Sequence, residues 1–176
     1  MSPDATGPAD PARELLIDSF RRIRDLVDDV AGEPPEVLAF HPAPGANTIA
    51  WLVWHLTRVQ DSHVAHLAGT EPVWSAAGWV DRFDLDLAPG ATGYGASADE
   101  VAALDGAPGD LLLGYHADVH AATAAYLERV DAAELARVVD TNWDPPVTAS
   151  ARLVSIIGDC LQHVGQAAYV RGLAEG

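Results

Sequence analysis

Residues 47–67 read NTIAWLVWHLTRVQDSHVAHL, and this stretch decides the fold class. Its apolar side chains return every three or four residues, which is the period of an α-helix with one buried face. Asn47 is predicted to cap the start of this helix, and Gly69 is predicted to end it. The predicted core stripe contains Ile49, Leu52, Val53, Leu56 and Val59, continued by Gln60 or His63. Such a helix has to bury its stripe against other elements, so its neighbours in the chain decide the architecture.

Three more segments show the same helical period. They are predicted to run from Pro11 to Gly32, from about Asp110 to Val130, and from Thr148 to Arg171 or beyond. Capping patterns at 97–100 and 131–134 predict two short helices in addition. The predicted buried faces contain Leu15, Leu16, Ile23, Leu26, Val27 and Val30 in the first segment, Leu112, Tyr115, Val119, Thr123, Tyr126 and Val130 in the second, and Leu153, Ile156, Ile157, Cys160, Val164, Ala167 and Ala168 in the third.

The segment 70–96 differs from these helices because it shows no sustained period. Its aromatic residues, among several glycines and prolines, predict a packed functional loop rather than a disordered one. No strand pattern is convincing elsewhere, so the sequence predicts an all-α four-helix bundle in which this loop crosses from the second long helix to the third. We expect residues 1–176 to form one domain, with residues 1–9 flexible. The aromatic residues of the loop are Trp74, Trp79, Phe83 and Tyr94.

The composition excludes several classes of function. The 176 residues carry 26 acidic and 10 basic side chains, a formal net charge of −16, and every basic residue is arginine. Such a surface repels phosphate backbones and anionic lipids, so binding to nucleic acid or to a membrane is not expected. A single cysteine excludes an internal disulfide, and the first ten residues show no signal-peptide pattern. We therefore expect a cytoplasmic protein.

Histidine and aspartate residues supply a candidate metal site. Asp159 and His163 are four residues apart on the last helix, so both side chains leave the same face. His55, inside an otherwise apolar run, is the natural third ligand from a facing helix. The plainer interpretations are a surface hydrogen bond for the pair and a core histidine for His55. The pairs His116/His120 and His63/His66 are rivals, and spacing alone does not choose among the three pairs.

Other reactive groups give weaker signals. Cys160 lies among apolar residues, which favours a buried inert thiol. The chain contains no glycine-rich phosphate loop, no GxSxG elbow and no Glu-x-x-His di-iron motif. Nucleotide binding, serine-hydrolase chemistry and di-iron chemistry are therefore disfavoured.

Two segments together resemble a known superfamily. Residues 47–56, NTIAWLVWHL, resemble the second-helix signature of the DinB/YfiT-like metalloproteins, and residues 159–166, DCLQHVGQ, resemble their last-helix signature. The resemblance implies a four-helix bundle that holds a divalent metal ion, zinc or nickel above all, through His55, Asp159 and His163. Many relatives have histidine where Asp159 stands; a carboxylate there is similar to the branch that includes mycothiol-dependent maleylpyruvate isomerase.

The resemblance also implies an activity. Relatives with an assigned reaction use a low-molecular-weight thiol, so the chain is expected to be a mycothiol-type S-transferase, isomerase or hydrolase that acts on a small electrophile. In this hypothesis the metal holds the thiolate, Gln166 orients water or substrate, and the loop 70–96 covers the pocket. Arg58, Arg82 and Arg152 are the candidates for holding an anionic thiol.

An alternative hypothesis comes from a different class. The chain could be a non-catalytic, stress-related bundle protein that binds a metal or a ligand, because many members of the superfamily have no known reaction. A homodimer is expected under both hypotheses, since such bundles often associate through two long helices, and exposed tryptophans would be consistent with this. An open metal position connected to a pocket would favour the enzyme, and a closed site would favour the binding protein.

Overall fold

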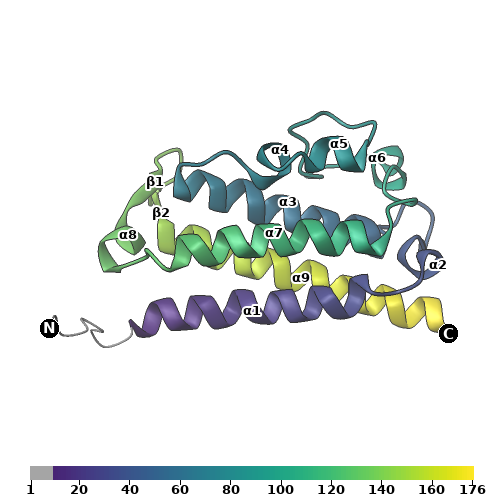
Figure 1. Cartoon of the computed structure of the whole chain (residues 1–176), viewed down its shortest axis with the longest axis horizontal. Helices are drawn as coiled ribbons and strands as arrows, with labels where there is room; N and C mark the ends of the chain where they lie inside the picture. Colours follow the sequence, from purple (N-terminus) through teal and green to yellow (C-terminus); the bar gives the residue numbers. More distant parts are fainter. Residues whose placement is uncertain (1–9) are drawn as a thin grey trace, which may run out of the picture.

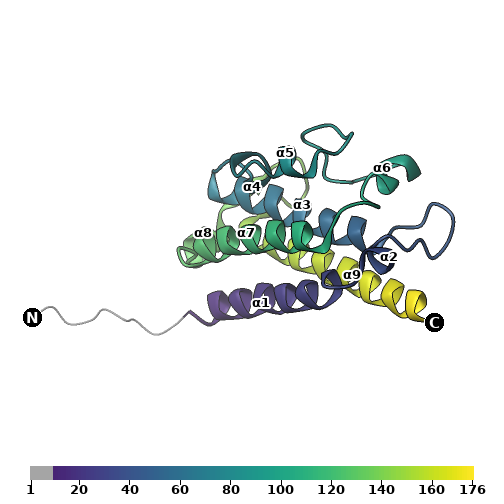
Figure 2. The same ribbon diagram turned by 45° about the vertical axis from the view of Figure 1, so that its right-hand side comes forward.

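Four long helices form the bundle that the sequence predicts (Figures 1 and 2). The computed structural model describes residues 10–176, so the flexibility expected of residues 1–9 lies outside the described residues. Each long helix packs mainly on two others: α1 on α7 and α9, and α3 on α7 and α9, with a smaller contact between α1 and α3. None of the helices in the described part of the chain combines the length and apolar character needed to cross a membrane. The long helices are α1 (Pro11–Ala31), α3 (Ile49–Ala68), α7 (Gly109–Leu127) and α9 (Ala149–Glu175).

The ends of the long helices follow local capping chemistry. The side chain of Thr48 accepts a hydrogen bond from the backbone N–H of Trp51, and Thr148 caps α9 in the same way. The prediction of Asn47 as the cap of α3 is therefore wrong by one residue. Gly69 ends α3 in the left-handed conformation at φ +68°, as predicted, because glycine adopts this conformation without a steric cost.

Short elements connect the long helices. The two short helices predicted from capping patterns are present, as α6 and α8. Three further helices and a small antiparallel pair of strands were not predicted, because each is too short to show a period. The short elements are α2 (Pro35–Leu38), α4 (Val73–Ala76), α5 (Trp79–Phe83), α6 (Ala98–Ala102), α8 (Ala132–Ala136), β1 (Val138–Asp140) and β2 (Val147–Thr148).

The core lies between the long helices, and its composition corrects two predictions. Leu15 and Leu26 belong to the predicted buried face of α1 but are exposed, whereas Phe20, which was not predicted, is buried. Ala168, from the predicted buried face of α9, is exposed as well. Four of the five tryptophans are buried, so the expectation of exposed tryptophans is wrong except for Trp143. The loop 70–96 explains why these tryptophans are buried. It carries α4 and α5 across the outer side of α3 and α7, so α3 is buried on nearly all sides (Figure 1).

Candidate metal centre

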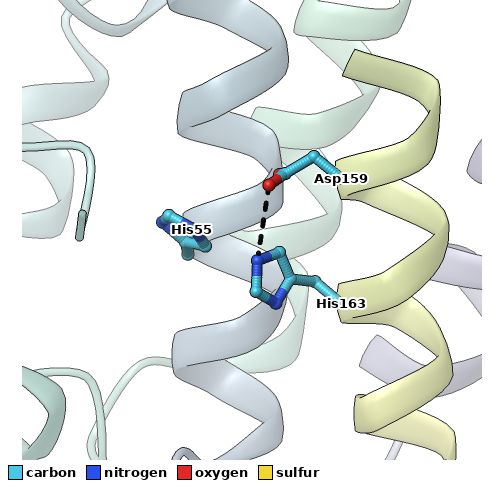
Figure 3. A group of neighbouring side chains, drawn as sticks. All are labelled: His55, Asp159 and His163. Carbon is cyan, nitrogen blue, oxygen red and sulfur yellow. Dashed lines mark ion pairs between the residues drawn. The ribbon is translucent and has the colours of Figure 1, made fainter. Parts of the chain in front are cut away.

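Figure 3 shows His55 of α3 beside Asp159 and His163 of α9. One potential ligand atom from each residue lies within 4.8 Å of those of the other two. His163 Nε2 is 3.6 Å from Asp159 Oδ1, and the rings of His55 and His163 meet edge to face with centroids 4.6 Å apart. Among residues 10–176, no second group of three histidine, cysteine or acidic side chains meets in this way. The structure thus brings together the three residues that the sequence singled out.

His55 is held with one ring nitrogen free for a ligand. Its Nδ1 lies 2.5 Å from the backbone oxygen of Thr92. A carbonyl oxygen only accepts hydrogen bonds, so Nδ1 carries the proton and Nε2 of the neutral ring keeps its lone pair. Burial lowers the pKa of His55, and the ring stacks on Trp51 with centroids 4.7 Å apart. A neutral imidazole oriented by a carbonyl is the usual form of a metal-binding histidine.

Asp159 and His163 complete a donor set that a divalent cation would satisfy. Burial opposes ionisation of Asp159, but the interaction with His163 and the nearby histidines outweighs it and lowers the pKa of the carboxyl group. Oδ2 of Asp159 is buried and has no hydrogen-bond partner among the described residues. Asp159 also raises the pKa of His163, whose Nδ1 donates to Gln166 Oε1 at 3.1 Å. Two imidazoles and one carboxylate, of which one oxygen has no hydrogen-bond partner, form a donor set that suits Zn²⁺ or Ni²⁺.

The loop 70–96 packs directly on this centre. Two side chains of α3 donate hydrogen bonds to the backbone of the loop: His55 to the oxygen of Thr92, and Arg58 Nε to the oxygen of Ala91 at 3.0 Å. Within the loop, Trp74 Nε1 donates to the oxygen of Pro89 at 3.0 Å. Gly93, which follows Thr92, has φ +87°, and a Cβ built on it would lie 2.8 Å from His55 Nδ1. The loop is therefore a wall of the site, and it encloses a cavity of about 80 Å³ beside Trp51 and Thr92.

The rival histidine pairs lie elsewhere. His116 is buried, its Nδ1 is 3.1 Å from Thr57 Oγ1, and burial lowers its pKa to about 3. Nε2 of His116 and Nδ1 of His120 have no partner in the described part of the chain, and no third metal-binding side chain joins them there. His63 is half-buried near the charges of Arg152 and Asp159, and it joins no group of three within residues 10–176.

Two of the three candidate arginines have structural roles. Arg58 is buried, with its NH1 3.5 Å from the carboxylate of Asp61, and Arg82 stacks on Trp79 at 3.5 Å from the ring centroid. Arg152 pairs with Asp140 at 3.1 Å but remains partly exposed, two helical turns from Asp159 on α9. Arg152 is therefore the best placed of the three to meet an anionic ligand near the site.

Sequence reasoning did not find Thr92 or Gly93. Thr92 acts through its backbone oxygen, which every residue possesses, so no side-chain pattern could identify it. Gly93 belongs to the run Gly93–Tyr94–Gly95, whose two glycines signal close approach or positive φ without naming the partner.

Comparisons with known proteins concern the family of the chain and its fold. The sequence model of a family described as mycothiol-S-transferase matches residues 15–176, which include the three candidate ligands and the loop over them. A solved structure, described as a conserved protein from Enterococcus faecalis, is 32% identical. It superposes with a TM-score of 0.88 over 96% of this chain and 99% of that chain. No curated protein matches the sequence.

Proposed function

Because the chain belongs to the mycothiol-S-transferase family, we propose that it is a metal-dependent enzyme that joins a mycothiol-type thiol, through its sulfur, to a small electrophile. The observation that carries the proposal is the meeting of His55, Asp159 and His163 with ligand atoms within 4.8 Å. We place the reaction in the cytoplasm, where low-molecular-weight thiols are kept reduced.

The proposed ligands are Nε2 of His55, Nε2 of His163 and the carboxylate of Asp159. A divalent ion in this set would stabilise a thiolate and make it available as a nucleophile at neutral pH. Three protein ligands leave at least one coordination position for the thiol sulfur, which is the arrangement of catalytic rather than structural zinc sites. Zinc and nickel are both compatible with two nitrogen donors and one oxygen donor.

Neighbouring groups orient these ligands. The Thr92 carbonyl fixes the tautomer of His55, and we propose that Gln166 does the same for His163 by accepting its Nδ1–H. Gln166 is thus a positioning residue in this proposal, which refines its expected role with water or substrate. The loop around Thr92 and Gly93 lies against the His55 side of the centre.

The chemical change is a nucleophilic transfer. The thiol loses its proton to solvent, and its sulfur forms a bond to the electrophilic carbon. That carbon then releases a leaving group with the bonding electrons. If the reaction is an addition to a double bond, the electron pair moves instead to the neighbouring atom of that bond, which takes up a proton. An isomerase or hydrolase would share this first step and differ in the later fate of the adduct.

Metal content tests the site directly. Protein purified without a histidine tag would be analysed by elemental mass spectrometry as wild type, His55→Ala, Asp159→Ala and His163→Ala. We expect near-stoichiometric metal in the wild type and loss in each variant. His66→Ala is the matched control because His66 is an exposed histidine on the same helix as His55. Folded wild type that stays metal-free after incubation with zinc, nickel or manganese would exclude the proposal.

Thiol consumption then tests the activity. Mycothiol and glutathione would each be mixed with a fluorogenic alkylating agent such as monobromobimane, with and without enzyme. The metal-loaded wild type should accelerate consumption of mycothiol, and the three ligand variants should not.

The alternative, a metal-binding protein without catalysis, is favoured by one observation. The cavity that the loop forms beside Trp51 and Thr92 is small, at about 80 Å³, and none of the three proposed ligands lines it. Stoichiometric metal binding without acceleration for any thiol and electrophile pair would support this alternative.

A further inference from the structure

A small cavity lies between α3 and the connection that joins α5 to α6. Its volume is about 80 Å³, which is room for roughly three or four heavy atoms, since one water molecule takes up about 30 Å³ in the liquid. Two of its lining residues, Tyr94 and Glu100, are exposed, so the cavity opens at the surface. The aliphatic part of its wall consists of Leu87, Ala91 and Ala96.

The two tryptophans that line this cavity have hydrogen-bond donors without acceptors. Trp51 is 5% exposed and Trp54 is 1% exposed, and the indole N–H of each is buried and has no hydrogen-bond partner among residues 10–176. The other two buried tryptophans, Trp74 and Trp79, each donate to an oxygen at 3.0 Å. A buried donor that stays unpaired costs free energy, so native proteins rarely keep one. Two such donors beside one cavity indicate that an acceptor from outside the chain belongs there.

Gly93 brings the backbone of the connection against both rings. Its φ is +87°, and a Cβ built on it would lie 3.1 Å from the ring of Trp51 and 3.1 Å from the ring of Trp54. Thr92 also lines the cavity, and its backbone oxygen accepts from His55, on which Trp51 stacks with ring centroids 4.7 Å apart. The cavity therefore adjoins the candidate metal centre without containing any of its proposed ligands.

The charges around the cavity decide which kind of acceptor suits it. The carboxylate of Glu100 accepts from the backbone N–H of Ser97 at 2.8 Å and from its hydroxyl at 3.0 Å, which lowers the pKa of Glu100 and keeps it ionised at neutral pH. An anion in the cavity would be repelled by Glu100 and by the formal net charge of −16. A cation would be attracted to Glu100, but it would leave both indole N–H groups unpaired. A neutral acceptor avoids both costs.

We propose that this cavity binds a small neutral carbonyl compound of the acetamide type, whose oxygen accepts from the indole N–H groups of Trp51 and Trp54. A carbonyl oxygen has two lone pairs, so one oxygen can accept from both donors. The methyl group of such a ligand packs on the aliphatic wall, as in other small-ligand sites that combine apolar walls with a few placed donors. The proposal does not rest on the proposed function, because no metal ion takes part in this binding.

Nuclear magnetic resonance of the tryptophan side chains tests the proposal. Each of the five indole N–H groups gives one ¹H–¹⁵N peak, and single substitutions by phenylalanine assign these peaks. Acetamide, titrated into the full-length protein, should shift the peaks of Trp51 and Trp54 saturably, with a Kd of about 1 mM or weaker because the ligand is so small. Trp143, exposed between β1 and β2, is the internal control and should show no saturable shift. If the two peaks stay unmoved at the highest soluble concentration, the cavity holds water only and the proposal is overturned.

Charged probes of similar size test the chemical class of the ligand. Acetate should not shift the peaks of Trp51 and Trp54, because Glu100 and the net charge of the protein repel it. Tetramethylammonium should not shift them either, because it offers no acceptor. Acetate that binds as tightly as acetamide would show an anion site, and saturable binding of tetramethylammonium would show an aromatic cage for cations. Either result would overturn the proposal.

Substitutions in the cavity wall test the residues. Trp54→Phe removes one donor, so acetamide should bind about five- to tenfold more weakly. Ala96→Leu should abolish the saturable shift, because it fills the cavity and leaves both indoles in place. Trp143→Phe is the matched control and should leave the affinity unchanged.

Folding and metal binding are monitored in the same proteins. Trp54→Phe and Ala96→Leu should keep the helical circular dichroism and the metal content of the wild type, so failure of this proposal is distinguishable from failure of the metal site. Folded Trp54→Phe and Ala96→Leu proteins that bind acetamide as tightly as the wild type would overturn the assignment of the cavity.

Discussion

Gly93→Ala is the sharpest test of how the loop supports the candidate metal centre. Gly93 has φ +87°, and the new Cβ would lie 2.8 Å from His55 Nδ1 and 3.1 Å from the rings of Trp51 and Trp54. The substitution therefore has two costs. A non-glycine residue at positive φ costs about 1–2 kcal/mol, and overpacking a filled site costs about 1–3 kcal/mol.

These costs add up to roughly 2–5 kcal/mol of lost stability, or a fall in melting temperature of about 4–20 °C for a domain of this size. Gly95→Ala is the matched control because Gly95 has φ +70° but open space around its Cβ position. It should lose only the backbone part, about 1–2 kcal/mol. The difference between the two variants isolates the contact with His55 and its neighbours.

Metal affinity distinguishes support of His55 from simple destabilisation. To relieve the clash, the loop has to move away from the ring, which weakens the hydrogen bond between His55 Nδ1 and the Thr92 oxygen. Loss of such a partner of a metal ligand typically lowers affinity by about 10–100-fold. Competition with a chromophoric chelator, at a temperature where both variants are folded, would measure it. Equal affinities for Gly93→Ala and Gly95→Ala would refute the role of the loop.

Three further predictions concern stability. Asp61→Asn should destabilise the fold by about 3–5 kcal/mol in urea denaturation, because Asp61 is the buried partner of Arg58 and accepts the phenol of Tyr115 at 2.7 Å. Burial lowers the pKa of His116 to about 3, so the unfolded chain binds more protons below about pH 6.5. In that range the free energy of unfolding should decrease by up to about 1.4 kcal/mol for each unit by which the pH is lowered, and His116→Gln should make this dependence on pH weaker. The bond to Asp105 raises the pKa of His41, so this partly exposed pair should add less than about 1 kcal/mol below pH 6.5. That stability should be lost as the pH rises through the raised pKa, and Asp105→Asn should remove the dependence.

The long helices could be predicted because each is long enough to repeat its apolar pattern several times. The apolar pattern was a less reliable guide to which of these residues are buried in the core. Leu15 and Leu26 are apolar and share the period of α1, yet they face away from the core that Phe20 enters. Periodicity identifies an apolar face, but only the neighbouring helices decide how much of it is buried.

The candidate site could be predicted in part for a similar reason. The spacing of Asp159 and His163 fixes their common face, because a helix brings residues four apart together. His55 was proposed because it lies inside an apolar run, but the preference for this group over His116/His120 came from a resemblance, since no local rule links residues more than a hundred positions apart. The support from Thr92 could not be predicted, because a backbone oxygen leaves no trace in the sequence.

The arrangement of α9 and α3 explains how the three candidate ligands meet. His163 follows Asp159 by four residues, which places the two side chains about 40° apart around α9 and about one turn apart along it. Both side chains lie on the side of α9 that packs against α3. On α3, His55 is fixed by burial on nearly all sides and by its hydrogen bond to the loop. The donor set is therefore ordered by the packing of two helices and one loop before any metal ion binds.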